Sequence, residues 1–253
     1  MRPPGRRRVR WLQSVVAMAL VASVSACGSD DPVATPAASA TTPDVGPVPD
    51  DHGLSEQQLA AVLPSTVSIQ GVACGRVASG SGFALTDTLV VTNAHVILGI
   101  DEITVHTFDG DEFIGTPVAF DADADLAILD VPDADFVPLP LTERAANGST
   151  GVLVGWERGG FADPTPYRVE RRVTVRIESV GSTTRVERPA WLIAAEVQVG
   201  DSGAALVDRT GEVIGVAFAT STAGEGVGYA VRSTAIEELM ARGLDPNQTV
   251  PDC

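Results

Sequence analysis

The chain contains 253 residues, of which 44% are hydrophobic and 5% aromatic, and it carries a formal net charge of −16. This length and apolar content are sufficient for one sizeable domain with its own core. Phosphate backbones and anionic lipid headgroups attract basic proteins, so the acidic balance argues against a nucleic-acid partner.

The first 26 residues are predicted to be a secretory signal peptide rather than part of the fold. Five arginines between residues 2 and 10 precede a short apolar run over residues 15–24, and such a run is too short to span a membrane comfortably. Residues 24–27, Val-Ser-Ala-Cys, resemble a bacterial lipobox, so we expect Cys27 to be the lipidated first residue of the mature protein. Ordinary signal cleavage with an incidental Cys27 is the alternative. Removing this segment leaves 12 basic and 33 acidic residues, a net charge of −21.

Residues 27–53 are rich in Pro, Ala, Thr and Asp and have no apolar periodicity. This composition predicts a disordered tether. A lipid on Cys27 would then hold an exported domain at the cell membrane, facing the periplasm or cell wall. The folded domain is expected over residues 54–253.

The domain is predicted to consist of short strands between two helices. The first helix is expected over residues 55–63, with Ser55 as its cap, and the second over residues 233–242. Between them, Gly, Asp, Asn and Pro separate short Val- and Ile-rich segments. Strands are expected over residues 66–71, 80–85, 89–92, 102–107, 115–121, 126–131, 151–155, 167–178, 192–196, 204–207, 213–219 and 227–231. Such regular spacing is typical of an all-β antiparallel barrel or sandwich.

Three residues in chain order, His95, Asp125 and Ser202, indicate an activated serine nucleophile. His95 follows the end of a predicted strand, Asp125 precedes the apolar run Leu-Ala-Ile-Leu, and Ser202 lies in Gly-Asp-Ser-Gly. In this chemistry the imidazole accepts the serine proton while the carboxylate orients the imidazole and stabilises its charge. The backbone N–H groups of Gly200 and Ser202 are expected to bind the oxyanion, since glycine leaves the approach open.

Two of the three residues, Asp125 and His95, have rivals, and Gly-Asp-Ser-Gly taken alone could be an ordinary turn. Asp121, Asp123 and Asp130 compete with Asp125, which we prefer because it borders an apolar run and so lies at the edge of the core. His52 falls in the tether and His106 in a predicted strand. The three histidines show no metal-ligand spacing, so no metal or other cofactor is expected. An α/β-hydrolase is disfavoured because position 204 is Ala, which breaks G-x-S-x-G, and no histidine follows Ser202.

Five motifs together resemble the chymotrypsin/trypsin-like serine peptidases in their bacterial, single-domain form. They are GSGFAL (80–85), VVTNAHV (90–96), DADLAILDV (123–131), GDSGAAL (200–206) and VGYAV (227–231), within a match over residues 65 to 242. The resemblance implies two antiparallel six-stranded β-barrels with the site between them. A closer resemblance is to the actinobacterial membrane-anchored acid-resistance serine proteases, which also have a cysteine before the His motif and one near the C-terminus.

The cysteines and the substrate pocket follow from this resemblance. With Cys27 assigned to lipid, Cys74 and Cys253 remain. An oxidising location favours a disulfide between them, and the resemblance supports it. Two free thiols are the alternative. It also implies pocket walls from Phe218, Ala219, Thr220, Gly228 and Tyr229. Glu196 would lie at the pocket floor and favour Arg or Lys substrates, unless it faces solvent. Ala204 and Ala205 depart from the family's Gly-Pro.

The prediction is therefore an exported, lipid-anchored serine endopeptidase that cleaves peptide bonds through an acyl-enzyme, with protein or peptide substrates. A protease-fold binding or scaffold protein with impaired catalysis is the alternative. An appended peptide-binding module is disfavoured, because the chain ends soon after the last predicted strand.

Overall fold

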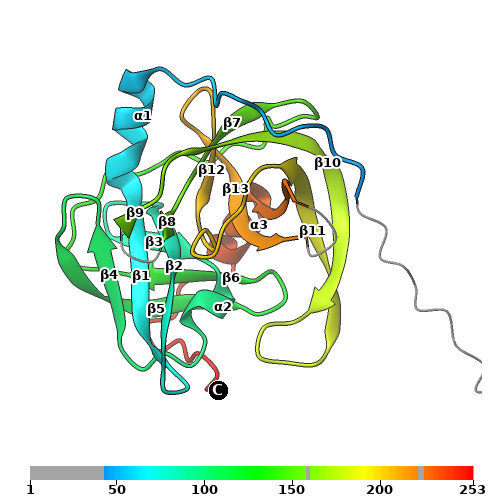
Figure 1. The fold of residues 1–253 in the computed structure, drawn as a ribbon. Helices are drawn as coiled ribbons and strands as arrows, with labels where there is room; N and C mark the ends of the chain where they lie inside the picture. Colours follow the sequence, from blue (N-terminus) through cyan, green and yellow to red (C-terminus); the bar gives the residue numbers. More distant parts are fainter. Residues whose placement is uncertain (1–42, 158–159, 222–224, 253) are drawn as a thin grey trace, which may run out of the picture. The chain divides into compact units, whose positions relative to one another are not determined.

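The computed structural model describes residues 43–157, 160–221 and 225–252. Two antiparallel barrels, each closed by six strands, dominate these residues (Figure 1). The first has the strand order β1-β2-β3-β6-β5-β4 and the second β10-β11-β14-β13-β12-β7. This confirms the all-β, two-barrel fold.

The first barrel is preceded by a capped helix. The helices here are α1 (Glu56–Val62), the 3₁₀ turn η1 (Leu63–Ser65) and the short α2 (Ala94–Ile97). The strands are β1 (Thr66–Ala73), β2 (Arg76–Ala84), β3 (Leu89–Thr92), β4 (Ile103–Thr107), β5 (Glu112–Asp121) and β6 (Leu126–Asp130). The Ser55 hydroxyl accepts the Gln58 N–H and the Gln58 side chain accepts the Ser55 N–H. This capping box satisfies two otherwise orphaned donors and confirms the predicted cap.

The second barrel is closed by longer strands and followed by a helix. Its strands are β7 (Thr150–Val154), β10 (Thr165–Glu178), β11 (Arg185–Ala194), β12 (Ala205–Asp208), β13 (Val213–Thr220) and β14 (Val227–Arg232). A small separate pair, β8 (Trp156–Glu157) and β9 (Gly160–Phe161), and the helix α3 (Ser233–Ala241) complete the elements. Strand β11 begins seven residues before the predicted start, and the β8–β9 pair was not predicted.

Buried apolar side chains form three clusters, one inside each barrel and one between the barrels. In β6, Ala127 and Leu129 belong to the cluster inside the first barrel, whereas Leu126 and Ile128 belong to the cluster shared with the second. Successive strand residues point to opposite faces, so a strand that is buried on both faces becomes a continuous apolar run. This explains the uninterrupted apolar run at residues 126–129.

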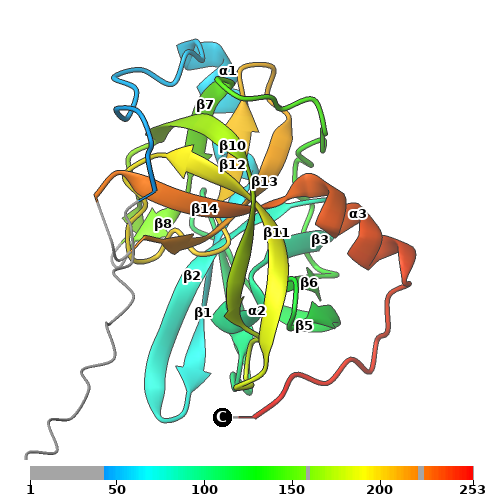
Figure 2. The same ribbon diagram turned by 90° about the vertical axis from the view of Figure 1, so that its right-hand side faces the viewer.

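The chain on either side of the barrels packs back onto them. Residues 43–53 contain no helix or strand and lie against the second barrel, where the Arg171 guanidinium donates to the Asp44 carbonyl at 3.1 Å (Figures 1 and 2). After α3 the chain returns to the first barrel: the Asp245 N–H donates to Val118 O at 2.8 Å, and Val250 packs against the first barrel's core. Residues 1–42, including the predicted signal peptide and Cys27, lie outside the described residues.

Candidate active site

His95 and Asp125 form a hydrogen-bonded pair at the edge of the first barrel. His95 lies in α2, the helical turn that follows β3, and its Nδ1 is 3.0 Å and 2.9 Å from the two carboxylate oxygens of Asp125. The His95 backbone N–H also donates to Asp125 Oδ1 at 3.0 Å. The Asp125 side chain is 4% exposed and the His95 side chain 38% exposed. A buried carboxylate therefore fixes one nitrogen of an imidazole whose other edge reaches solvent.

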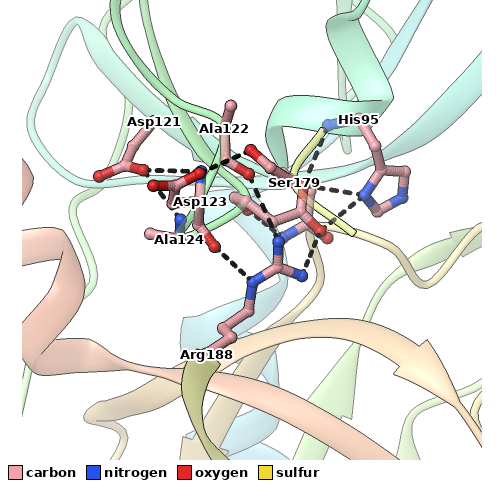
Figure 3. A network of polar contacts seen from close by, with 9 residues as sticks. His95, Asp121, Ala122, Asp123, Ala124, Ser179 and Arg188 are labelled. Carbon is pink, nitrogen blue, oxygen red and sulfur yellow. Dashed lines mark hydrogen bonds and ion pairs between the residues drawn. The ribbon is translucent and has the colours of Figure 1, made fainter. Parts of the chain in front are cut away.

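The backbone around Asp125 is unusual and well supported. Asp125 has a φ of 59°, in the left-handed region that Asp and Asn tolerate better than most residues. The Asn93 side-chain amide donates to the Asp125 carbonyl at 2.8 Å. The Asp121 carboxylate accepts the N–H groups of Asp123 and Ala124 at 3.0 and 2.8 Å (Figure 3). Asp121 thus shapes the turn that presents Asp125.

Ser202 lies in a tight turn at which two glycines are required. Gly200 has a φ of +116°, and a Cβ there would lie 2.3 Å from the Trp156 carbonyl oxygen. Gly203 has a φ of +89°, and a Cβ there would lie 2.0 Å from the Ser81 carbonyl oxygen. Neither position accepts a side chain without movement of the backbone.

Ser81, on β2 of the first barrel, holds this turn. Its hydroxyl donates to the Gly200 carbonyl at 2.7 Å and accepts the Trp156 N–H at 2.8 Å. Its own N–H donates to the Ser202 carbonyl at 2.8 Å. The N–H groups of Gly200 and Ser202 donate to no described residue, so both are available to a negatively charged oxygen.

His95 and Ser202 line the same cavity of about 590 Å³. Its lining also includes Gly200, Ala219 and Thr220, together with Val77, Ala78, Ser79, Val96, Val197, Gln198 and Val199. Within the described residues, the Ser202 hydroxyl makes no hydrogen bond with His95. Contacts between nucleophile and base are often long in the absence of substrate and shorten when substrate binds. The arrangement fits nucleophilic attack on a carbonyl held in this cavity.

Asp201 is buried beside the nucleophile and accepts the Gln198 N–H at 2.7 Å. Burial raises the pKa of this carboxyl from 3.8 to about 6; the Gln198 hydrogen bond opposes the rise and the charge of Glu157 adds to it. The carboxylate has no ion-pair partner among the described residues. A backbone hydrogen bond therefore occupies the Asp201 carboxylate.

The remaining predicted pocket residues lie in different places. Ala219 and Thr220 line the cavity, whereas Phe218 is buried with its ring under the guanidinium of Arg188 at 4.9 Å. Glu196 is exposed and lies outside the cavity lining. Gly228 and Tyr229 also lie outside it. Cys74 lies in the β1–β2 hairpin with a φ of 51°, and Cys253 lies outside the described residues.

Two side chains that contact the site were missed by sequence reasoning. Ser81 occurs in GSGFAL, where we predicted a strand, and nothing in this string signals a bond to Gly200. Arg188 lies in the polar segment that starts β11 and contacts Asp125. No sequence signal marks an arginine for burial.

Comparison with known families agrees with this geometry. The model of the trypsin-like peptidase domain matches residues 80–216. This chain belongs to the trypsin-like peptidase family. Serine protease Rv3671c of Mycobacterium tuberculosis is 33% identical over 198 residues, which cover 77% of this chain and 50% of that protein. Serine protease HTRA1A of Danio rerio is 30% identical over 179 residues, covering 67% of this chain and 35% of that protein.

Solved structures show the same fold. The crystal structure of the active form of the Rv3671c protease superposes with a TM-score of 0.73 at 31% identity, covering 83% of this chain and 94% of that one. An inactive form of the same protease superposes with a TM-score of 0.68 at 31% identity, covering 79% of this chain and 98% of that one. This trypsin-like peptidase spans about half the length of the first curated relatives that it matches.

No helix in the described part of the chain is long and apolar enough to cross a membrane.

Proposed function

We propose that the chain is an exported serine endopeptidase in which His95, Asp125 and Ser202 form the catalytic triad. The observation that carries the proposal is the pairing of His95 Nδ1 with a buried Asp125, while His95 shares a cavity with Ser202. Family membership supports the same reaction class, hydrolysis of peptide bonds.

The proposed reaction proceeds in two halves. The Ser202 hydroxyl oxygen attacks the substrate carbonyl carbon as His95 Nε2 accepts its proton. Asp125 stabilises the resulting imidazolium, and the N–H groups of Gly200 and Ser202 bind the oxyanion. His95 then gives the proton to the departing amine, leaving an acyl group on Ser202. A water molecule, deprotonated by the same imidazole, hydrolyses this acyl-enzyme and regenerates the hydroxyl.

A fluorophosphonate probe tests the assignment of the nucleophile. We expect the probe to label the wild-type chain at Ser202 and the Ser202→Ala variant not at all. Ser79, which also lines the cavity, provides the matched control, and Ser79→Ala is expected to label normally. Absence of label at Ser202 in a folded wild-type chain would contradict the proposal and favour the scaffold alternative.

One observation bears on that alternative. Ala204 and Ala205, which depart from the family's Gly-Pro, are fully buried and lie outside the lining of the cavity. They pack in the cluster inside the second barrel and in the cluster between the barrels, respectively. Their small side chains fill the core behind the nucleophile without narrowing the cavity, which favours an active enzyme.

The cavity supports a preference for uncharged substrate side chains. Among the described residues its lining carries no carboxylate, and the most exposed apolar members are Val77 (74%) and Val199 (82%). Because Glu196 lies outside the lining, we propose cleavage next to small or apolar residues rather than Arg or Lys. Profiling with a peptide library tests this; a preference for Arg or Lys that disappears in Glu196→Gln would contradict it.

We also propose a lipid anchor at Cys27 and a Cys74–Cys253 disulfide. The lipobox-like sequence at residues 24–27 supports the anchor, and incorporation of a fatty-acid analogue into wild type but not Cys27→Ala would test it.

The proposed disulfide is supported by the bonded state of Cys74 and by the position of the residues that precede Cys253 in the chain. The Gly99 N–H donates to Pro251 O at 3.2 Å, and the neighbouring Ile100 pairs with Ala73. Mass spectrometry of the unreduced chain after digestion tests the linkage.

A further inference from the structure

Arg188 is a buried cation directly behind the catalytic carboxylate. Only 2% of the residue is exposed, and its Nη1 lies 3.4 Å from Asp125 Oδ2. Its other donors contact backbone carbonyls of the turn before Asp125: Nε donates to Asp123 O at 2.8 Å and Nη2 to Ala122 O at 3.4 Å (Figure 3). The guanidinium therefore contacts both the turn that presents Asp125 and the Asp125 side chain.

Burial of this guanidinium is unfavourable on its own. Burial lowers the pKa of Arg188, and the negative charges of Asp125, Asp121 and Asp123 oppose this, with Asp125 first among them. An arginine stays protonated in proteins, so its charge needs compensation at this depth. The carboxylate that ranks first in that compensation, Asp125, is also the partner of His95.

Asp125 Oδ2 faces two cationic partners, Arg188 and the imidazolium form of His95. Where one carboxylate serves both, the fixed charge of Arg188 reduces the stabilisation that Asp125 gives to the imidazolium. This reduction is the repulsion of the imidazolium by the guanidinium. It favours the unprotonated imidazole, the form that acts as the base.

We propose that Arg188 is a positioning residue that holds Asp125 from the second barrel and extends the action of the base His95 to lower pH. The proposal rests on the proposed function, because it takes His95 as the base. It assigns no contact with substrate to Arg188.

The other charged groups near Arg188 lie behind it, around a second cavity of about 230 Å³. Asp121 and Asp123 come from the turn before Asp125, Glu187 from β11 and Arg232 from β14. Glu238 lies in α3, and Arg242 directly follows that helix. Asp121 forms an ion pair with Arg242, and Asp123 accepts the Ser179 hydroxyl at 2.6 Å. Neither carboxylate forms an ion pair with Arg188 among the described residues, and the ion pairs of Asp125 there are with His95 and Arg188.

The test measures protonation of His95 without requiring turnover. In the full chain with Ser202→Ala, NMR titration follows the three histidines, and His52 and His106 serve as internal references. We expect Arg188→Gln and Arg188→Met to move the His95 titration midpoint upward by about one pH unit, a tenfold change in proton affinity. Arg188→Lys, which keeps the charge, should largely restore the wild-type midpoint.

Turnover provides a second readout with Ser202 intact. The acid limb of the pH profile of kcat/KM should move upward by the same amount in the neutral variants. Arg172→Met is the matched control, because Arg172 also lies over an aromatic ring, that of Trp191 at 5.2 Å, but is exposed and does not contact Asp125. It should change neither the midpoint nor the acid limb.

Failure of the inference differs from failure of the proposed function. A His95 midpoint unchanged in folded Arg188→Gln or Arg188→Met would overturn the role of Arg188, even if the enzyme is active. If both neutral variants fail to fold, Arg188→Lys decides. Because Lys keeps the charge, an upward shift of the His95 titration midpoint by about one pH unit, as large as that expected for charge removal, would overturn the role of Arg188. Absence of turnover and of probe label in wild type would overturn the proposed function alone.

Discussion

The first barrel presents His95 and Asp125 as a hydrogen-bonded pair, whereas the second barrel presents a Ser202 hydroxyl that bonds to no other described residue. The two halves nevertheless share one device. Arg188 of the second barrel contacts Asp125 of the first, and Ser81 of the first barrel contacts Gly200 and Ser202 of the second. The segments of Asp125 and Ser202 are thus each held by a side chain from the opposite barrel, so the alignment of the proposed base and nucleophile depends on barrel packing.

The strongest test of the first half of this comparison is Asp125→Asn. The neutral amide forms no ion pair with the imidazolium and leaves His95 in the wrong tautomer, so kcat should fall about 10⁴-fold. Asn tolerates the left-handed backbone of this position. Loss of the negative charge beside buried Arg188 should lower the unfolding free energy, so circular dichroism checks that the variant is folded before its kinetics are compared. Asp123→Asn is the matched control, because Arg188 contacts the Asp123 carbonyl rather than its carboxylate. Steady-state kinetics on both variants decide; comparable losses would contradict the assignment of Asp125.

Ser81→Ala tests the second half of the comparison, the hold of the first barrel on the Ser202 turn. It leaves the buried Gly200 carbonyl and Trp156 N–H without their partner, a cost of about 1–3 kcal/mol. If that loss displaces the turn, kcat/KM should fall about 10–100-fold. Ser68 faces Ser81 across the β1–β2 ladder and provides the control. Ser68→Ala should leave kcat/KM unchanged; an unchanged value in Ser81→Ala would show that the turn holds itself.

Asp201→Asn tests how a buried carboxylate affects the stability of the segment that carries Ser202. Because the folded-state pKa is raised from 3.8 to about 6, the folded protein binds this proton more tightly than the unfolded chain. Stability therefore decreases as pH rises through this window, by about 3 kcal/mol at 1.36 kcal/mol per pKa unit. The neutral variant should not show this decrease.

Urea unfolding at several pH values between 4 and 7 measures the effect. The difference in unfolding free energy between Asp201→Asn and wild type should grow with pH in favour of the variant. Asp109→Asn, at an exposed position, should show a constant difference. A constant difference for Asp201→Asn as well would mean that the buried carboxylate costs nothing.

The smallest effect is expected from Phe218→Leu. This change removes the ring under the Arg188 guanidinium and part of a buried side chain, so it should lower the unfolding free energy by about 1–2 kcal/mol. The kcat at high pH should change little, because the ring lies outside the cavity lining. Phe113→Leu, in the first barrel, is the control for loss of an aromatic ring. A large loss of kcat in Phe218→Leu alone would place Phe218 against substrate.

Much of the fold was predictable because burial on both faces leaves a clear trace in sequence. The runs at residues 126–129 and 205–207 are apolar throughout, since alternate side chains enter different clusters. The preference for Asp125 over Asp121 and Asp123 followed from the same logic, and the structure gives the three aspartates different contacts.

The start of β11 was not predictable in this way. Residues 185–189, Arg-Val-Glu-Arg-Pro, are polar, and a strand prediction there would require a buried arginine. Its compensating carboxylate lies 63 residues earlier in the chain. Single-sequence patterns cannot detect such a distant pairing. The bonds of Ser81 were hidden for the same reason, since Gly200 lies 119 residues away.

The hydrogen bond from the Ser81 N–H to the Ser202 carbonyl links two halves of the chain that are joined by residues 131–149. If the segment 131–149 were cut, each fragment would keep the six strands of its own barrel but lose the opposing half of the active centre. Activity would then report on reassembly, and mixing the two pieces would turn this peptidase into a sensor of whatever brings them together.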